Sequence, residues 1–504
     1  MAGIDKRAVL ESLDIGNGVA ERERAVLKDF FLESSAWRKL RTGNADLVFG
    51  PKGSGKSTLF FNVIEHEYDL LEEGILIVSS ENTAGESVFS AARQNPPENE
   101  EEYIAIWKLY ILALIVDRCS KDGLNFREIK AVEQLLTQEG IYKKGRTISG
   151  FFSSVVEYVK SRLNFNTAEG EVEIDPATGI PKKLKGKFTF AEPSESGREK
   201  GLLPISDALM ACSKFLLDER KSIWILVDRL DVIFANDKKA EALALRALFR
   251  VYGEMHAMPA IKLKIFLRDD IWRDITRESG FREASHLIKK VSISWEKIPL
   301  ANLLIQRLVA SENFRIFYRL PNDFLRSTNK NKMGLINSLF PRQMNLFGEG
   351  TERAFDWLII HTRDGKDINT PRDLIELLNF AKDFEIDRLV MGERPYRAQN
   401  LLFNHEGLSK AGGQLSALKM EQTVFAEHPD MRQYIDAFFE SIPRNFDIEK
   451  LCALWSCDEV KAKAVSAKLA DIGFFKVTGR YRYLIPVLFT HYLGINPSKK
   501  KFDR

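Results

Sequence analysis

The chain has 504 residues, of which 44% are hydrophobic and 29% are charged, a composition that excludes a disordered or fibrous protein. At roughly 150 residues per domain, the length predicts about three folded domains. The 74 Lys and Arg residues nearly balance the 71 Asp and Glu residues, so the net charge is only +3 and any surface for nucleic acid must be local.

The first half of the chain predicts alternating strands and helices. An amphipathic helix is expected over residues 21–40, and a second helix, 57–68, follows a glycine-rich turn. Short apolar runs predict strands at 45–50, 74–79, 222–228 and 263–267. This order of elements predicts an α/β fold with a parallel sheet.

A long insertion interrupts the predicted sheet. Roughly 140 residues separate its second strand from its third, whereas a crossover needs only about a dozen, so residues 95–205 are predicted to form an inserted subdomain. The first part of this subdomain, residues 100–163, has a mostly helical pattern. Residues 171–190 alternate around a turn that contains Pro and Gly, which predicts an exposed hairpin.

Beyond a core of residues 1–290, the second half of the chain predicts a helical lid and a smaller domain. The lid spans 291–395, with breaks expected at Pro299, Pro321, Pro341 and Pro371. Residues 396–425 are richer in Gly, Ser and Asn, which predicts a linker. In residues 426–504, two short helices precede a hairpin, which is the order of a winged helix.

The most specific motif lies in the first glycine-rich turn. Residues 50–57 read GPKGSGKS and match GxxxxGK[ST] at every specified position, between a predicted strand and a predicted helix. Lys56 is expected to reach the β- and γ-phosphates of a nucleotide, and the Ser57 hydroxyl is expected to bind Mg²⁺. The predicted nucleotide-binding residues are Gly50, Pro51, Lys52, Gly53, Ser54, Gly55, Lys56, Ser57 and Thr58.

A magnesium nucleotide also needs carboxylates near the ends of neighbouring strands. Asp228 ends the apolar run IWILVD and is predicted to bind Mg²⁺ together with Ser57, because a charge at the end of a buried strand is costly without a cation. Asp231 or Glu81 would polarise the attacking water. The sequence leaves this choice open, and we favour Asp231.

Two arginines are predicted to contact the phosphates. Arg268 follows the LKIFL strand, and Arg372 lies in the first turn of a helix that begins at Thr370-Pro371. The planar guanidinium group binds phosphate oxygens in pairs, which suits both positions. The alternatives are a solvated strand end for Arg268 and a surface ion pair for Arg372.

With these residues, the chain resembles the additional-strand group of P-loop ATPases, close to the STAND and Orc/Cdc6-like AAA+ branches. The matching segments are GPKGSGKS at 50–57, WILVDRLD at 224–231, IFLRDD at 265–270 and TPRDLIELL at 370–378. In those families the corresponding positions are Walker A, Walker B with its catalytic acid, sensor 1 and a sensor 2 arginine. The segment IGNGVAERE, 15–23, is similar to the box that contacts adenine.

The resemblance implies an α/β P-loop NTPase core that binds ATP and Mg²⁺, with a large insertion, a helical lid and a winged helix. The Walker B segment reads DRLD and lacks the DE pair of AAA+ proteins, so it is more similar to the NACHT pattern. The layout resembles poorly characterised bacterial P-loop ATPases found near anti-phage defence genes, a likeness at the level of the fold.

The carboxyl-terminal region is the one locally basic part of the chain that we expect to meet DNA. Residues 444–504 contain twelve Lys or Arg and six Asp or Glu, a net charge of +6. Arg480 and Arg482 flank Tyr481 in the predicted hairpin, and basic residues next to aromatic ones suit a DNA backbone. The alternative is that this domain binds a protein or packs on the ATPase core.

These observations predict an ATPase that works as a slow molecular switch, in which the nucleotide state controls the engagement of a partner or of DNA. A homo-oligomer is expected, because lid closure in the families that the chain resembles commonly receives an Arg from a neighbour. The alternative is a scaffold or sensor that binds an effector protein and uses the nucleotide for stability without hydrolysing it.

The sequence also predicts the cellular compartment in which the protein lies. None of the four cysteines forms a CxxC pair, which excludes a zinc ribbon or disulfide framework and predicts a reducing cytoplasm. The first residues, MAGIDKRAVLES, lack the apolar stretch of a secretory signal. The most apolar run, 104–116, is shorter than the ~20 residues of a membrane-spanning helix, so no membrane partner is expected.

Overall fold

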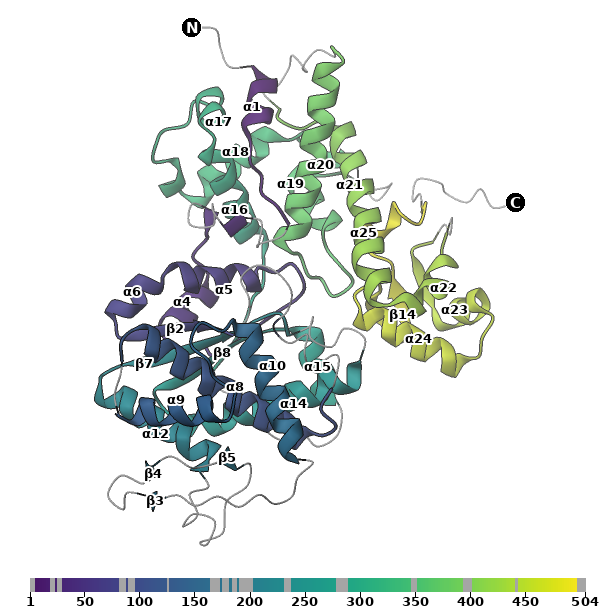
Figure 1. Ribbon diagram of the computed structural model, residues 1–504. Coiled ribbons are helices and arrows are strands. Elements are labelled where there is room, and N and C mark those ends of the chain that lie inside the picture. The colour runs from purple at the N-terminus through teal and green to yellow at the C-terminus, as the bar shows by residue number, and fades with distance from the viewer. Residues whose placement is uncertain are drawn as a thin grey trace. The chain divides into compact units, whose positions relative to one another are not determined.

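The structure is a computed structural model, and its ribbon is drawn in Figure 1. It describes residues 5–18, 23–24, 30–80, 88, 96–124, 127–163, 173–174, 181–183, 188–189, 203–230, 237–277, 289–345, 351–392, 401–439 and 443–495. The chain divides into two compact units. The core unit comprises Glu33–Pro51 and Lys56–Ile293, and the lid unit comprises Met1–Leu32, Lys52–Gly55 and Ser294–Arg504.

A five-stranded parallel sheet forms the centre of the core unit, as the sequence predicts. In spatial order its strands are β2 (Ile75–Ser79), β7 (Ser222–Val227), β8 (Ile261–Arg268), β1 (Leu47–Gly50) and β9 (Lys290–Ser292). The four apolar runs are confirmed as strands. The sequence does not reveal β9, because it has three residues and only its middle residue is buried.

Strand β8 lies between β1 and β7, so one additional strand separates the strand before the glycine-rich loop from the strand that ends next to Asp228. This strand is buried along nearly its whole length although it contains Lys264. The Lys264 ammonium donates to the Asp46 carboxylate and to the Ala45 carbonyl, each at 2.7 Å, and lies 4.2 Å from the centre of a Trp224 ring. These partners make the buried charge tolerable.

The predicted insertion is mostly helical. Its central helix, α8 (Glu100–Lys121), is buried on nearly all sides because almost every residue from Tyr103 to Cys119 is apolar. The helices packed against it are α9 (Arg127–Gln138), α10 (Ile148–Leu163), α12 (Ile205–Asp218) and α14 (Lys238–Glu254).

The predicted hairpin is present in part. Strands β3 (Glu173–Ile174) and β4 (Pro181–Lys183) pair antiparallel. The prediction that the second strand continues to Phe190 is wrong, because β5 (Phe188–Thr189) pairs in parallel with β6 (Leu203–Pro204), just before α12.

The helix before the first strand is shorter than predicted. Helix α4 (Ser35–Arg41) begins only where the Ser34 hydroxyl accepts a hydrogen bond from the Trp37 amide at 3.1 Å, which caps the helix. Residues 31–34 are not helical, so one helix across 21–40 is wrong. The other described helices of the core unit are α5 (Lys56–Glu65), α6 (Glu67–Glu72), η2 (Met255–Ala257) and α15 (Asp269–Arg277).

The lid unit is mainly helical. As far as Val390, its described helices are α1 (Lys6–Ser12), α16 (Lys297–Ala310), α17 (Glu312–Phe317), η4 (Phe324–Arg326), α18 (Asn329–Leu339), α19 (Ala354–His361) and α20 (Pro371–Val390), with a short hairpin of β10 (Met344–Asn345) and β11 (Thr351–Glu352). The break predicted at Pro299 is wrong. This proline lies in the first turn of α16, where its missing N–H costs no hydrogen bond.

Most of the predicted linker, 396–425, is instead helix. Helix α21 (His405–Lys419) continues into a π-helical turn, η5 (Met420–Phe425), and α21 runs beside α20 (Figure 1). The glycines that suggested a linker allow close packing. A Cβ placed on Gly407 would lie 2.8 Å from the Phe384 ring, and one on Gly412 would lie 3.4 Å from Trp357.

The amino-terminal residues group with the lid unit rather than with the core predicted at 1–290. Side chains of α20 hold them along their length. Lys382 donates to the Leu13 carbonyl at 3.1 Å, and Asn379 donates to the Gly16 carbonyl at 2.8 Å. Lys6 forms an ion pair with Glu385 at 2.7 Å. The sequence gives no sign of these pairs, because their members are more than 360 positions apart.

The carboxyl-terminal region has the predicted order of elements. After η6 (Pro429–Met431) and α22 (Arg432–Asp436) come β12 (Asn445–Asp447), α23 (Ile448–Trp455), α24 (Glu459–Asp471), β13 (Lys476–Gly479), β14 (Arg482–Leu484) and α25 (Val487–Thr490). The three strands form an antiparallel sheet in the order β12-β14-β13. The hairpin turns at Tyr481, whose positive φ of 56° is unusual for a residue other than glycine.

All four cysteines are free thiols. In the part of the chain that the structure describes, no helix is both long enough and apolar enough to cross a membrane.

Candidate nucleotide site

The loop of residues 50–57 connects strand β1 to helix α5, as the motif requires. Gly53 and Gly55 have positive φ angles of 80° and 94°, a conformation that a residue with a Cβ rarely adopts. These glycines fold the loop back so that helix α5 begins at Lys56. Amides at the start of a helix carry partial positive charge, so this end of α5 is suited to an anion.

The Lys56 side chain turns back along its own loop. Its ammonium group donates to the carbonyl oxygens of Gly50 and Pro51, both at 2.9 Å. Ser57 and Thr58 lie in the first turn of α5 and are half-buried. Lys56 and Ser57 therefore place an ammonium group and a hydroxyl group in the first turn of α5, and these are groups that a magnesium-bound triphosphate needs.

Asp228 follows the last residue of β7 and is only 4% exposed. The chain turns sharply after it, since Arg229 has a φ of 57°. Because β7, β8 and β1 are parallel neighbours, their carboxyl ends share one edge of the sheet with the loop. Asp228 thus stands at the edge where a metal bound by Ser57 would be, and the residues present fit a magnesium nucleotide.

Arg268 ends strand β8 opposite Gly50, the residue with which the loop begins. Its guanidinium group binds the Asp270 carboxylate through two nitrogens, at 3.1 and 2.6 Å. Burial alone would raise the pKa of Asp270, but the hydrogen bonds and positive charge of Arg268 outweigh it and lower the pKa to about 2. Arg268 therefore lies beside the loop, with its charge shared by a carboxylate. Its contact with a phosphate stays a prediction.

The two candidates for the catalytic acid, Asp231 and Glu81, both lie outside the described residues. The choice between them stays a prediction.

Arg372 is the second residue of helix α20, after the Thr370 cap and Pro371, as the sequence predicts. Its Nε donates to the Gly18 carbonyl at 2.5 Å. The tip of the loop, which groups with the lid unit, lies against this turn. A Cβ placed on Gly53 would be 3.0 Å from the Arg372 Cβ and 3.2 Å from the Thr370 hydroxyl, so only glycine fits there.

The segment that resembles an adenine box is held by a buried ion pair. Arg307 of α16 donates from its two terminal nitrogens, Nη1 and Nη2, to the Glu23 carboxylate, at 3.0 and 2.7 Å. Glu23 also accepts a hydrogen bond from the Asn17 amide. A Cβ on Gly16 would lie 1.9 Å from Arg307, which explains a glycine at this position. The sequence does not single out Arg307.

Three further contacts at the loop and at the start of α20 join residues that are far apart in the sequence. Lys52 forms an ion pair with Glu427 at 2.6 Å, and the Trp295 indole donates to the Ser54 carbonyl at 2.8 Å. The Asp373 carboxylate accepts from Lys419 at 2.9 Å. No local pattern marks Trp295, Lys419 or Glu427 as functional, because each acts through a partner brought close only by folding.

The strand order and the loop together define the fold of the core unit. Strand β8 lies between β1 and β7, and the glycine-rich loop leads from β1 into α5. The core unit thus has an α/β fold in which a glycine-rich loop joins a strand of a parallel sheet to a helix.

Comparisons with known proteins give weaker information. No model of a known protein family matches the chain. An 80.3 kDa protein of Escherichia coli (strain K12) that takes its name from transposon gamma-delta is 23% identical over 476 residues. The match covers 92% of this chain and 61% of that protein, so this chain spans less than two thirds of the relative's length.

Two similar solved structures are a Walker-type ATPase of Pyrococcus abyssi and the ADP form of the ORC2 protein of Aeropyrum pernix. The first is 12% identical with a TM-score of 0.39, and the match covers 93% of this chain and 97% of that one. The second is 12% identical with a TM-score of 0.30, over 96% of this chain and 93% of that one. With scores this low, the assignment of the fold rests on this chain's own sheet and loop.

Proposed function

We propose that the chain binds ATP with Mg²⁺ at residues 50–57 and hydrolyses it slowly as a molecular switch. The observation that carries this proposal is the β1-loop-α5 geometry, with Lys56 at the start of α5 and buried Asp228 at the same edge of the sheet. Lys56 would hold the β- and γ-phosphates, and Ser57 and Asp228 would hold Mg²⁺, which would neutralise phosphate charge. Asp231, or alternatively Glu81, would orient the attacking water.

The start of α20 is the second part of the switch. Arg372 lies in the same turn that packs against Gly53, and its guanidinium Nε donates to the Gly18 carbonyl oxygen. A γ-phosphate is a stronger partner for a guanidinium group than a neutral carbonyl. Exchange of the Gly18 carbonyl for the phosphate would therefore move the first turn of α20 when ATP binds.

The contacts around residues 364–367 support transmission of that movement to the carboxyl-terminal region. The Gly365 amide donates to the Gly473 carbonyl at 2.7 Å, and Lys476 forms an ion pair with Asp367 at 2.7 Å. A Cβ on Gly365 would lie 2.2 Å from the Phe475 carbonyl oxygen. The loop that leads into α20 is thus packed directly on the turn between α24 and β13.

DNA is the partner that we propose for this region, which we interpret as a winged helix. The order of α23, α24 and the β13-β14 hairpin supports this interpretation. Arg480 and Arg482 are exposed on the hairpin, and the Lys463 ammonium of α24 lies 4.4 Å from the Tyr481 ring. If Arg480→Ala with Arg482→Ala leaves the affinity for duplex DNA and its salt dependence unchanged, this assignment is wrong.

The oligomeric state, biological role and cellular location that we propose for the switch are inferred from the sequence. A homo-oligomer in which a neighbour supplies an Arg, and a role in bacterial anti-phage defence, both follow from the family resemblance. A cytoplasmic location follows from the cysteine usage. The mass of the purified protein with and without ATP tests the oligomer directly.

Nucleotide binding and phosphate release test the central proposal. Lys56→Ala should weaken ATP binding by on the order of 100-fold, because it removes the ammonium group that would hold the phosphates. Asp228→Asn keeps the shape of the side chain and should lower turnover by a similar factor while nucleotide still binds. Lys39→Ala, an exposed lysine on α4, is the matched control and should change neither quantity.

The same measurements separate the switch from the alternative scaffold. Equal ATP turnover in Lys56→Ala and the parent protein would contradict the switch. Tight ATP binding without phosphate release, unaffected by Asp231→Ala or Glu81→Ala, would support the scaffold that uses nucleotide only for stability.

A further inference from the structure

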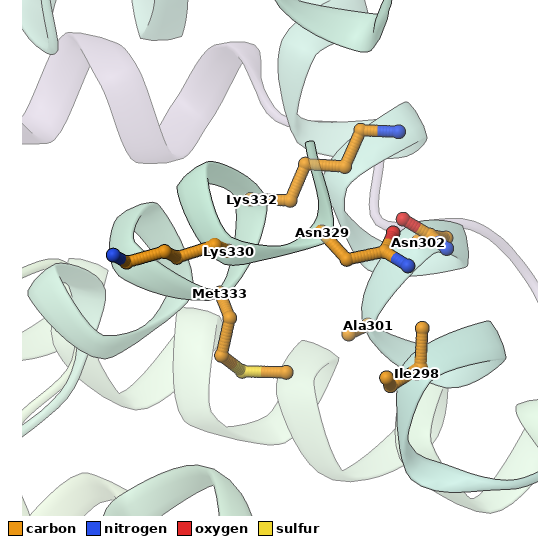
Figure 2. A pocket seen from close by; sticks show the side chains of 7 residues that line it. All are labelled: Ile298, Ala301, Asn302, Asn329, Lys330, Lys332 and Met333. Atoms are coloured by element: carbon orange, nitrogen blue, oxygen red, sulfur yellow. The ribbon is translucent and has the colours of Figure 1, made fainter. Parts of the chain in front are cut away.

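Helices α16 and α18 of the lid unit line a cavity of about 230 Å³ (Figure 2). Ile298 and Ala301 come from the first turns of α16, and Met333 comes from the first turns of α18. In Figure 2, the Met333 and Ile298 side chains point toward each other across the cavity. Ile298 is 47% exposed, a large exposed fraction for an isoleucine, so this cavity has an apolar rim open to solvent.

The volume of the cavity limits what it can hold. Sites for cofactors and drug-sized molecules occupy about 300–1,000 Å³, so this cavity is too small for a nucleotide. It is large enough for one apolar amino-acid side chain. Methionine is unbranched and adapts its shape to what it packs against, so Met333 suits a site that receives a side chain from outside.

Two of the residues that line the cavity, Lys330 and Lys332, are basic, and helix α18, from which they come, contains no Asp or Glu. Lys330 and Lys332 line the cavity from the first turn of α18, where the backbone amides add partial positive charge. Their side chains extend away from the centre of the cavity (Figure 2).

Neither lysine forms an ion pair or a side-chain hydrogen bond with another described residue. This differs from Lys297, one position before Ile298, which forms an ion pair with Asp356. The apolar cavity is therefore bordered by two positive charges that no described carboxylate neutralises. A ligand that matches both features carries an apolar side chain with negative charges next to it.

We propose that this cavity is the docking site for a short acidic segment of a partner protein. One apolar side chain of the segment inserts between Ile298 and Met333, and carboxylates beside it pair with Lys330 and Lys332. A nucleic acid would satisfy the lysines but would leave the apolar walls unfilled, so a peptide fits better. The site is separate from residues 50–57 and does not depend on the proposed ATPase activity.

Selection from a library of random 12-residue peptides displayed on phage tests the proposal. The full chain is the bait, and peptides that also bind the Lys330→Glu/Lys332→Glu variant are removed. We expect the remaining peptides to share an apolar residue flanked by Asp or Glu. A selection that enriches nothing, or enriches peptides without acidic residues, would overturn the proposal.

A synthetic peptide with the selected sequence is then used to measure how much the two lysines and Ile298 each contribute to affinity. Fluorescence anisotropy should show affinity falling by on the order of tenfold in Lys330→Glu/Lys332→Glu. The Ile298→Ser variant should lose affinity to a similar degree, and binding to the parent chain should weaken with salt. Ile298 and both lysines face solvent at least in part, and glutamates in the first turn of α18 favour the helix, so both variants should stay folded.

Lys143→Glu/Lys144→Glu reverses two exposed lysines of the core unit and is the matched control. It should bind the peptide as tightly as the parent chain. Equal loss in this control and in Lys330→Glu/Lys332→Glu would show attraction by net charge alone and would overturn the assigned site. Binding of duplex DNA that depends on Lys330 and Lys332, while no selected peptide binds, would also overturn the assigned site.

Discussion

The edge of the core sheet and the start of helix α20 both surround parts of the same glycine-rich loop, but they are built differently. At the sheet edge, Arg268 ends strand β8, Asp228 directly follows strand β7, and Lys56 begins helix α5. Each residue therefore takes its place from a local sequence pattern. At the start of α20 and at the tip of the loop, the ion pairs join residues 46 and 375 positions apart, Asp373 to Lys419 and Lys52 to Glu427 respectively.

The difference indicates that one region would bind the nucleotide and the other would respond to it. Residues that would bind the nucleotide are fixed by the strands and the loop, which depend on buried apolar packing. Residues that would report the nucleotide are held by polar contacts between distant parts of the chain, of which the partly exposed Lys52–Glu427 pair is worth little in free energy. Substitutions of buried core residues should therefore act mainly on stability, whereas loss of the exposed Lys52–Glu427 pair should act mainly on nucleotide binding.

The largest effect on stability is expected at Lys264. Lys264→Met leaves the Asp46 carboxylate buried without its cation, and such a loss costs about 3–5 kcal/mol. Urea unfolding of the variant and the parent chain measures the difference. A cost near zero would show that the buried pair does not stabilise the sheet.

The pH dependence of the same pair sharpens this test. Burial lowers the pKa of Lys264 to about 8 from its usual 10.5, although Asp46 opposes the shift. Between these values the unfolded chain binds a proton that the folded chain does not, so this lysine's contribution to the free energy of unfolding rises with pH. The difference in stability between the parent chain and Lys264→Met should therefore grow from pH 8 to pH 10.

A smaller effect is expected where the loop before α20 meets the carboxyl-terminal region. Gly365→Ala would push a methyl group against the Phe475 carbonyl and should cost about 1–3 kcal/mol, because the backbone must move apart. Gly253→Ala in α14 is the control, since nothing lies within 4 Å of its added methyl group. Equal unfolding free energies for the two variants would contradict a tight contact at Gly365.

The sequence predicts the core well because its signals are local. The apolar runs specify four of the five strands, and the glycine pattern specifies the loop between β1 and α5. Even the helix start at Thr370-Pro371 follows from capping chemistry, which places Arg372 correctly in the first turn.

The sequence predicts the lid unit less well because the same residue types serve different purposes there. The glycines of α21 suggested a linker, yet they allow helix packing against Phe384 and Trp357. Glu427 and Trp295 carry no pattern at all, since their partners in the loop lie hundreds of positions away. Long-range polar contacts of this kind follow from the complete fold and not from a window of sequence.

The smallest effect is expected when the Lys52–Glu427 ion pair is removed. Both side chains are partly exposed, so Glu427→Gln should change the unfolding free energy by less than about 1 kcal/mol. It removes a negative charge beside the loop and releases the Lys52 ammonium, so ATP should bind tighter by roughly two- to fivefold at low salt, less at high salt. Glu421→Gln removes a half-exposed carboxylate six residues earlier in the chain that contacts Tyr492; it is the control and should leave ATP affinity unchanged. Unchanged affinity in Glu427→Gln at low salt would show that this pair is a surface contact without influence on nucleotide binding.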